Sequence, residues 1–406
     1  MNHGWTIVVY GNIVENLNVS LSRHINIFRY LPGRLIPLLA GMLLLAACAA
    51  QQHSNLKPPP LLHDGPEVQV AEVDVLAVSP AMEQFLERYI LKYADRHTRL
   101  TLLMNAASAN GVLGFKYDED LTLTSTEAFD MRAGNCIGFA NMLVALARRA
   151  GLKAEYQEVF RRPEWSTRED TVLLVKHINV VLESPPYTYV MDVSSIRFNA
   201  NVRRRVISDD YAKALYLNNI GAESLIKNDL PTAYAYMLEA IKTEPLLADS
   251  WVNMGVVLGR NEQLDDAALV LHKALEIDGE EQSAASNLYE VYMAQGDMDS
   301  AAQLEGKVER YRQNNPYYLL QLSEEALELN NYEESIDLLQ RAIRKKSDDH
   351  MLHFALAKTQ YISGEREAAE YSLLRARELA PESMLAYYDR PLDELIAEQQ
   401  TEANPE

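Results

Sequence analysis

The chain has 406 residues, a length that predicts two or three domains rather than one. Its formal charge of −20 argues against binding nucleic acid or anionic polysaccharide over a broad surface, because phosphate contacts need clusters of Lys and Arg. The 2 cysteines, Cys48 and Cys136, are too few for a cysteine metal site, and no glycine-rich phosphate loop follows a strand. We therefore expect no nucleic acid, no metal and no cofactor.

Residues 1–47 have the pattern of an export signal. The apolar run 35–47 follows three arginines and is too short to span a bilayer as a mature helix. The run ends in Leu45-Ala46-Ala47-Cys48, which resembles the bacterial lipobox, in which the cysteine is acylated and becomes the mature N-terminus. An ordinary signal peptide with an incidental cysteine is the alternative. A second apolar patch, Trp5 to Tyr10, makes the segment unusually long, and a misplaced start codon is one explanation.

The lipobox resemblance implies a cellular location and a lipid anchor. Alanine rather than aspartate at position 49 resembles lipoproteins that are sent to the outer membrane. We therefore expect a bacterial envelope protein that is anchored by a lipid on Cys48 to the periplasmic face of the outer membrane. Residues 48–67 are polar and contain Lys57-Pro58-Pro59-Pro60. This composition predicts a flexible tether with a stiff polyproline piece.

Residues 68–212 predict an α+β domain. Apolar spacing indicates a helix from Met82 to Met104, a short helix capped by one of the hydroxyl residues 124–126, and a helix from Cys136 to Gly151. Strand-like runs follow at 154–160, 171–183 and 187–193, and the last two flank the turn-forming Ser184-Pro185-Pro186. Helices first and an antiparallel sheet afterwards are typical of an α+β fold.

Three residues of this domain could form a nucleophilic site. Cys136 begins a helix, where unpaired N–H groups and the helix dipole favour a thiolate. A hairpin centred on Ser184-Pro185 puts His177 directly opposite Asp192, whereas one centred on Pro185-Pro186 makes them diagonal neighbours. Either register puts both on one face, because strand side chains alternate with period two. Thiol, general base and orienting acid would then all be present. In the alternative, each of the three is a satisfied core residue.

The segment from Thr126 to Val159 resembles the transglutaminase-like superfamily of papain-like folds. It has arginine, glycine and cysteine, then a helix that ends in arginine and glycine before the first strand. The separations from Cys136 to His177, and from His177 to Asp192, are also those that the family shows. The resemblance covers roughly residues 80 to 200 and implies that Cys136 is the nucleophile, His177 the general base and Asp192 its orienter.

The chemistry implied by this resemblance is acyl transfer through a thioester. Water as the acceptor gives a peptidase or amidase, whereas an amine gives a transglutaminase, and the triad is the same for both. The backbone N–H of Cys136 supplies one oxyanion donor, and the second is unassigned. Asn179 departs from the family, which often has an aromatic residue two places after the histidine.

Residues 213–383 form a repeat of constant length, in units that start at 214, 248, 282, 316 and 350. Mostly small residues recur at the eighth position, which is occupied by Gly221, Gly255, Tyr289, Ser323 and Ala357. With Trp251 and Pro245, the pattern resembles tetratricopeptide (TPR) repeats and predicts an all-α solenoid of five helix pairs whose groove binds a peptide or protein. Residues 384–406 predict a capping helix, Leu385 to Leu395, and a polar tail.

Taken together, these features predict a membrane-tethered periplasmic thiol enzyme that attacks an amide or peptide bond. Its repeats would recruit a protein partner or substrate. The alternative is a non-catalytic lipoprotein adaptor, or scaffold, in which the TPR groove is the functional site.

Overall fold

The computed structural model describes residues 6–10, 22–25, 58–63, 66–108, 110–168, 171–193 and 202–396. The chain forms two compact units, residues 1–301 and 302–406, which we describe separately. Cys48, the apolar run 35–47 and the tail from residue 397 onward lie outside the described residues. In the part that is described, no helix is both long and apolar enough to cross a membrane.

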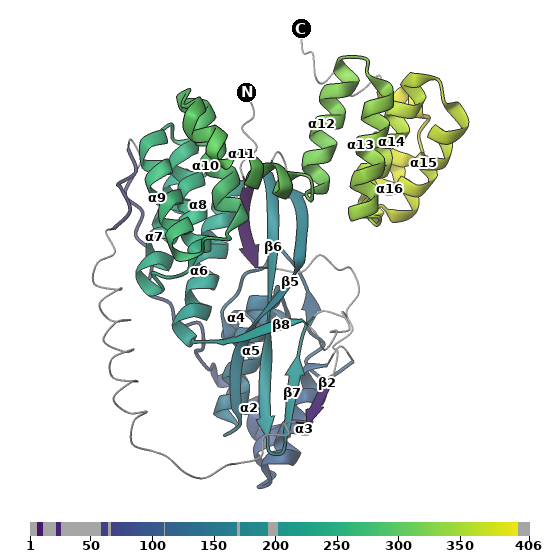
Figure 1. The fold of residues 1–406 in the computed structure, drawn as a ribbon. Coiled ribbons are helices and arrows are strands. Elements are labelled where there is room, and N and C mark those ends of the chain that lie inside the picture. Colours follow the sequence, from purple (N-terminus) through teal and green to yellow (C-terminus); the bar gives the residue numbers. More distant parts are fainter. Residues whose placement is uncertain are drawn as a thin grey trace. The chain divides into compact units, whose positions relative to one another are not determined.

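The helices of the α+β domain lie in the chain between the first two strands of its main sheet and the other strands of that sheet (Figure 1). They are α2 (Pro80–Leu86), the π-helical turn η1 (Glu87–Leu91), α3 (Arg96–Ala107), α4 (Ser125–Met131) and α5 (Cys136–Arg149). The single helix predicted from Met82 to Met104 is wrong, since η1 and a short turn divide it. The carboxylate of Asp95 accepts the backbone N–H of Thr98 at 2.7 Å and so starts a new helix.

The three strands predicted from sequence are confirmed as β5 (Lys153–Arg168), β6 (Thr171–Ser184) and β7 (Tyr187–Met191). The sheet has the order β2-β7-β6-β5-β8, and a further strand, β1, also pairs with β6. The sequence did not predict β1 (Thr6–Tyr10), β2 (Ser22–Ile25) or β8 (Arg203–Ile207). A second, small sheet joins β3 (Lys116–Tyr117) to β4 (Ala133–Gly134), directly before α5.

Helix α5 is the central element of the domain core. Every residue from Cys136 to Ala147 is buried, so the helix is surrounded on all sides. The buried Asn141 is satisfied because its Nδ2 donates to the carbonyl of Leu123 at 3.0 Å and its Oδ1 accepts from the hydroxyl of Tyr156 at 2.8 Å. These bonds fix α5 against the preceding loop and strand β5.

The repeats form antiparallel helix pairs. The first unit holds α6 (Asp209–Ile226), α7 (Leu230–Thr243), α8 (Ala248–Arg260), α9 (Leu264–Ile277) and α10 (Gln282–Gln295), and α11 (Met298–Arg312) follows across the boundary. The second unit continues with α12 (Pro316–Glu328), α13 (Tyr332–Lys345), α14 (His350–Ser363), α15 (Arg366–Leu379) and α16 (Glu382–Tyr388). The predicted period is confirmed, since α8, α10, α12 and α14 begin at the predicted unit starts.

Small residues occur where paired helices approach each other closely, as the repeat pattern predicts. A Cβ added to Gly255 would lie 2.6 Å from Cγ of Leu271 on the partner helix α9. Gly221 has the same position in the first repeat, where a Cβ would lie 2.8 Å from Cε of Met237. Gly255 therefore allows α8 and α9 to pack closely, because a side chain there would overlap Cγ of Leu271. At Gly221, in contrast, the nearest atom is the flexible end of Met237.

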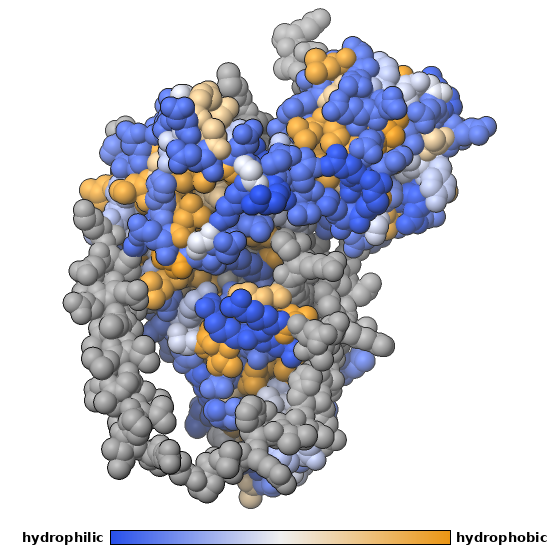
Figure 2. Space-filling view, viewed as in Figure 1, coloured by the Kyte–Doolittle hydropathy of each residue, from blue (hydrophilic) through white to orange (hydrophobic). Residues whose placement is uncertain are grey.

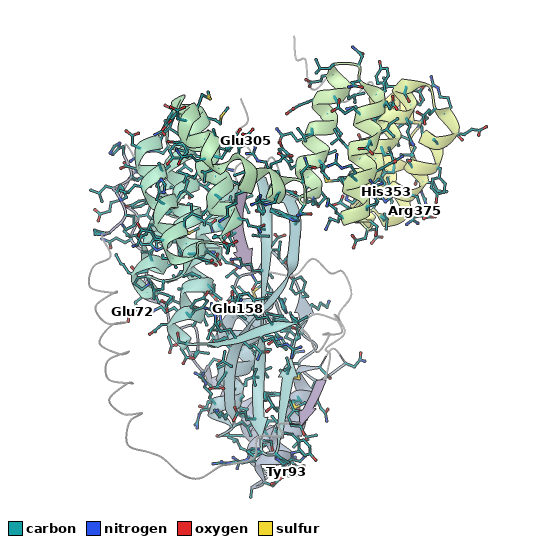
Figure 3. The ribbon with its side chains drawn as sticks, viewed as in Figure 1. Glu72, Tyr93, Glu158, Glu305, His353 and Arg375 are labelled. Atoms are coloured by element: carbon teal, nitrogen blue, oxygen red, sulfur yellow. The ribbon has the colours of Figure 1, made fainter. Side chains whose placement is uncertain are left out.

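The first repeats are joined to the α+β domain by polar contacts. Arg148 at the end of α5 forms a bidentate pair with Asp209 at the start of α6, with N–O distances of 2.6 and 2.9 Å. The hydroxyl of Thr122 donates to Glu223 on α6 at 2.6 Å. Glu158 on β5 lies close to α6 (Figure 3) and accepts from Arg205 of β8 at 2.6 Å. The sheet and the first repeats therefore form one compact unit.

Part of the predicted tether is attached to the repeats. The hydroxyl of Tyr234 donates to the carbonyl of Pro60 at 2.9 Å, and Nε2 of Gln263 donates to that of Leu61 at 2.9 Å. His63 has both backbone groups engaged, since its N–H donates to Gln263 at 2.8 Å and its carbonyl accepts from Asn261 at 3.0 Å. Within the predicted tether 48–67, residues 60–63 are therefore held, because an extended chain offers backbone groups to side chains of the repeats.

The second unit has its own apolar core and a groove. Tyr388, Leu392, Leu395 and Ile396 pack against buried residues of α14 and α15 at the end of the helical array. A groove of about 360 Å³ is lined by residues of α13, α14 and α15, among them Arg344, His353, Gln360 and Tyr371. The groove is lined by both polar and apolar side chains. The surface in Figure 2 is likewise largely hydrophilic, with apolar patches over the helices.

Candidate active site

The sequence around Cys136 fixes the cysteine at the N-terminus of α5. Asn135 is the N-cap, and its Oδ1 accepts the backbone N–H groups of Ile137 at 3.0 Å and Gly138 at 3.1 Å. Its Nδ2 donates to the hydroxyl of Thr122 at 2.8 Å, so the cap itself is held in place. The N–H of Cys136 is not among the amides capped by Asn135. The sulfur lies in the positive field of the helix terminus.

The β6–β7 hairpin brings His177 and Asp192 together. Ser184 pairs with Tyr187 and Val180 with Met191, so the turn is centred on Pro185-Pro186. Of the two registers left open by the sequence, the structure has the one with diagonal neighbours. Nε2 of His177 lies 2.7 Å from Oδ2 of Asp192, directly beyond the end of β7.

The thiol of Cys136 lies beside the ring of His177 and contributes to its pKa, so all three predicted residues meet. A carboxylate only accepts hydrogen bonds, so Nε2 of His177 must carry a proton toward Asp192. This leaves Nδ1 as the ring nitrogen that is available to the thiol. The three side chains are almost completely buried, with exposed fractions of 1% for Cys136, 2% for His177 and 0% for Asp192.

Electrostatics favour a charged imidazole at this position. Burial lowers the pKa of His177, but the charge of Asp192, its hydrogen bond and the contact with Cys136 outweigh burial and raise the pKa from 6.5 to about 9. At neutral pH the ring is therefore an imidazolium beside the sulfur. Such a cation stabilises a thiolate, which is the nucleophilic form of cysteine.

Asn179 is a site residue whose role the sequence did not reveal. Its Nδ2 donates to Oδ2 of Asp192 at 3.2 Å, so the same carboxylate oxygen is held by both His177 and Asn179. The sequence carried a signal for this contact, because residues two apart on a strand share one face. Where the resemblance suggested an aromatic residue, this chain has an amide that orients the carboxylate.

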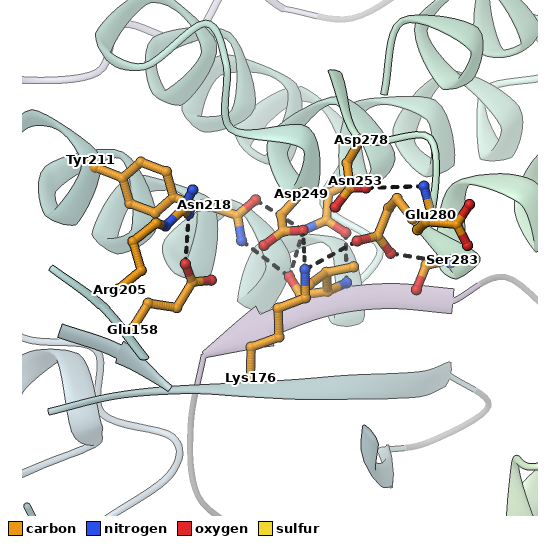
Figure 4. A network of polar contacts seen from close by, with 12 residues as sticks. Glu158, Lys176, Arg205, Tyr211, Asn218, Asp249, Asn253, Asp278, Glu280 and Ser283 are labelled. Atoms are coloured by element: carbon orange, nitrogen blue, oxygen red, sulfur yellow. Dashed lines mark hydrogen bonds and ion pairs between the residues drawn. The ribbon is translucent and has the colours of Figure 1, made fainter. Parts of the chain in front are cut away.

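Lys176, next to His177, anchors strand β6 to the repeats. Its Nζ lies 2.6 Å from Asp249 and 3.1 Å from Glu281, at the starts of α8 and α10 (Figure 4). Burial lowers the pKa of Lys176, but the two carboxylates outweigh it and hold the pKa well above 10.5. Strand alternation turns this side chain away from the face of His177, and sequence alone could not show which helices it would meet.

The residue types at this site are those of a thiol nucleophile. In the described ranges, no group of three or more His, Cys, Asp or Glu side chains could hold a metal ion. The constellation of thiol, imidazole and carboxylate fits nucleophilic acyl transfer, which requires no cofactor.

Comparison with known proteins agrees with this architecture. A family model described as "Transglutaminase-like superfamily" matches residues 98–190, and one described as "Tetratricopeptide repeat" matches residues 320–383. The first range includes Cys136 and His177. No curated protein matches the chain.

Solved structures with similar helical repeats include two MamA proteins and YrrB. MamA from Desulfovibrio magneticus RS-1 is 17% identical, with 42% of this chain and 96% of that chain covered and a TM-score of 0.28. MamA AMB-1 is 19% identical, with coverages of 42% and 96% and a TM-score of 0.26. YrrB, described as "a TPR protein with an unusual peptide-binding site", is 18% identical, with coverages of 43% and 91% and a TM-score of 0.25. These TM-scores carry no functional argument. With the two family matches, the observed elements identify the chain as a transglutaminase-like α+β domain followed by tetratricopeptide repeats.

Proposed function

We propose that this protein is a membrane-tethered thiol enzyme that transfers acyl groups from an amide or peptide substrate. The observation that supports this most directly is the contact chain Cys136–His177–Asp192 at the N-terminus of α5. The carboxylate holds the imidazolium, the imidazolium faces the sulfur, and the helix terminus adds its positive field.

The reaction would proceed in two half-reactions. The thiolate of Cys136 attacks the amide carbonyl, forming a C–S bond and an oxyanion close to the N–H of Cys136. The C–N bond then breaks as the imidazolium of His177 gives its proton to the leaving amine, which leaves a thioester. In the second half-reaction, water or an acceptor amine attacks the thioester carbonyl and gives a proton to neutral His177. The C–S bond then breaks and returns the thiolate of Cys136. Asp192 stabilises the imidazolium in both half-reactions.

The repeats would recruit a protein, which is the general role of TPR surfaces. The groove in the second unit supports this, because Arg344 and His353 supply positive or polar groups beside the exposed ring of Tyr371. An extended peptide with acidic or polar side chains fits such a lining better than a basic one.

The proposal includes an envelope location, supported by the lipobox-like Leu45-Ala46-Ala47-Cys48. Acylation of Cys48 would leave residues 49–59 between the lipid and the held segment that starts at Pro60. A chain of this length reaches at most about 40 Å. Replacing Cys48 with alanine should move the protein from the membrane fraction to the soluble fraction. If it stayed in the membrane fraction, the lipid anchor would be wrong.

The enzyme hypothesis is tested by the reactivity of Cys136. The thiol is 1% exposed, so the reagent must be a small electrophile such as iodoacetamide. At pH 7 we expect Cys136 to be alkylated faster than glutathione, and His177→Ala to abolish the difference. Ser184→Ala, on the same strand but outside the contact chain, is the matched control. Incorporation of a labelled amine into envelope protein would then indicate a transglutaminase, and release of free peptide would indicate a hydrolase.

The burial of Cys136 favours a second candidate, a non-catalytic adaptor. A nucleophile enclosed in this way must become accessible before it can meet a protein substrate. If alkylation of Cys136 is no faster than that of glutathione, the adaptor function replaces the enzyme function, with the TPR surface as the working part.

A further inference from the structure

Strand β1 occupies a slot between the sheet and the first repeats (Figure 1). It runs parallel to β6, with Ile7 opposite Leu173 and Val8 opposite Leu174. Helices α6, α8 and α10 lie against its other side. Ile7 and Val8 are both 0% exposed, so the slot encloses an extended chain on all sides at these two residues.

Two asparagines of the repeats bind the backbone of β1 (Figure 4). Oδ1 of Asn253 accepts the N–H of Val8 at 2.8 Å, and Nδ2 of Asn253 donates to the carbonyl of Val8 at 2.7 Å. Nδ2 of Asn218 donates to the same carbonyl at 3.1 Å, and Nδ2 of Asn253 also donates to Oδ1 of Asn218 at 3.0 Å. These contacts of the two asparagines are to main-chain atoms of Val8, so they can form with any residue at that position except proline.

Asn253 belongs to a pattern of the repeats. Asn219, Asn253 and Asn287 occupy the same position, the sixth, in the first three repeats. All three side chains are buried, and Asn253 and Asn287 have 0% exposure. Buried amides require hydrogen-bond partners. Nδ2 of Asn219 donates to the hydroxyl of Thr122 at 3.5 Å, whereas Oδ1 and Nδ2 of Asn253 both bind the main chain of Val8. An enclosed main chain supplies both a donor and an acceptor, so the amide of Asn253 is suited to an extended polypeptide.

The other wall of the slot is an open strand edge. On this edge of β6, β7 pairs with Val180 to Ser184 and β1 with Val172 to Lys176. Without β1, the edge from Val172 to Lys176 would present backbone N–H and carbonyl groups with no strand beside them. Adding a strand from another chain is a common way to satisfy such an edge.

We propose that this slot binds an extended segment of the protein substrate as a parallel strand, in the position that Thr6–Tyr10 occupies here. The inference rests on the proposed function, since export would remove residues 1–47 and with them β1. The occupant it fits has two adjacent uncharged apolar residues, because the positions of Ile7 and Val8 are fully enclosed. The parallel direction places Tyr10 opposite Lys176, so the chain that follows the docked segment leaves the slot beside His177. The slot would thus position a substrate for attack by Cys136.

The test uses the processed protein purified from membranes in detergent, as its Cys136→Ala variant so that turnover cannot consume the ligand. Mass spectrometry first establishes its N-terminus. The probe is a fluorescein-labelled peptide with the sequence of Trp5 to Gly11, titrated by fluorescence polarisation. We expect saturable binding that is weakened about tenfold or more by N-methylation at Val8, because the methyl group removes the donor to Asn253. The peptide with Val8→Asp should also bind weakly, and neither change alters the protein.

Several results would overturn the inference. It is wrong if the mature protein retains residues 6–10, if the peptide does not bind, or if N-methylation leaves binding unchanged. Alkylation of wild-type Cys136 by iodoacetamide, measured separately, distinguishes this failure from failure of the proposed function. Rapid alkylation of Cys136 without peptide binding would reject the docking slot and leave the proposed enzyme function in place. Peptide binding with an unreactive Cys136 would support the slot and reject the enzyme function.

Discussion

Replacing Asp192 with asparagine tests the electrostatic basis of the candidate site. The side chain keeps its size but loses its charge, while His177 stays buried at 2% exposure. Burial alone lowers the pKa of the imidazole, and Asp192 is the main group that raises it to about 9. The variant should therefore titrate below the ordinary value of 6.5. The difference between 6.5 and about 9 corresponds to roughly 3 kcal/mol of preference for the charged ring.

This preference also predicts a pH-dependent stability. A histidine whose pKa is raised on folding contributes stability that is fully present below pH 6.5 and is lost as the pH rises through about 9. Asp192→Asn should lower the free energy of unfolding by roughly 3 kcal/mol at pH 6, and by much less at pH 10. Urea unfolding followed by tryptophan fluorescence measures both values, and NMR titration of the His177 ring gives the pKa directly.

Asn179→Ala is the matched control, because it removes a different contact of the Asp192 carboxylate and leaves its charge. The His177 pKa should remain well above 6.5 in this variant. The reasoning is refuted if the ring still titrates near pH 9 in Asp192→Asn, or if the loss of stability is the same at pH 6 and pH 10.

Two further predictions concern the repeats. Lys176→Met leaves the buried carboxylates of Asp249 and Glu281 without their cation, so it should cost about 3 to 5 kcal/mol in urea unfolding. Adding Asp249→Asn and Glu281→Gln should restore most of that loss, and a triple variant as unstable as the single one would contradict the ion-pair explanation. Gly255→Ala should destabilise the protein by about 1 to 2 kcal/mol, since overpacking exceeds the gain in helix propensity. Gly306→Ala, with no atom within 4 Å of the added Cβ, should instead stabilise it by up to about 1 kcal/mol. Thermal unfolding that shows the same sign for both would refute the packing argument.

Much of the fold follows from local pattern. The repeats were predictable because a helix pair buries its small residues at fixed positions, and α8, α10, α12 and α14 begin where the period places them. The helix behind Cys136 was predictable because its apolar spacing and the arginines and glycine at its end are local signals. The break at Asp95 was missed because the continuous apolar pattern outweighed a single capping residue. Strands β1 and β8 have little periodicity of their own and exist only by pairing with β6 and β5.

The sequence by itself determined the identity of the candidate triad and the common face of His177 and Asp192, because strand alternation is a property of the backbone. It also determined the repeat architecture. Only the tertiary structure decided which hairpin register forms, that Asn179 shares the carboxylate of Asp192, and that Lys176 is held by Asp249 and Glu281. The slot beside β6 and the asparagines that face it likewise belong to the tertiary structure. These features join residues that are far apart in the chain, and such contacts depend on how whole elements pack rather than on local spacing.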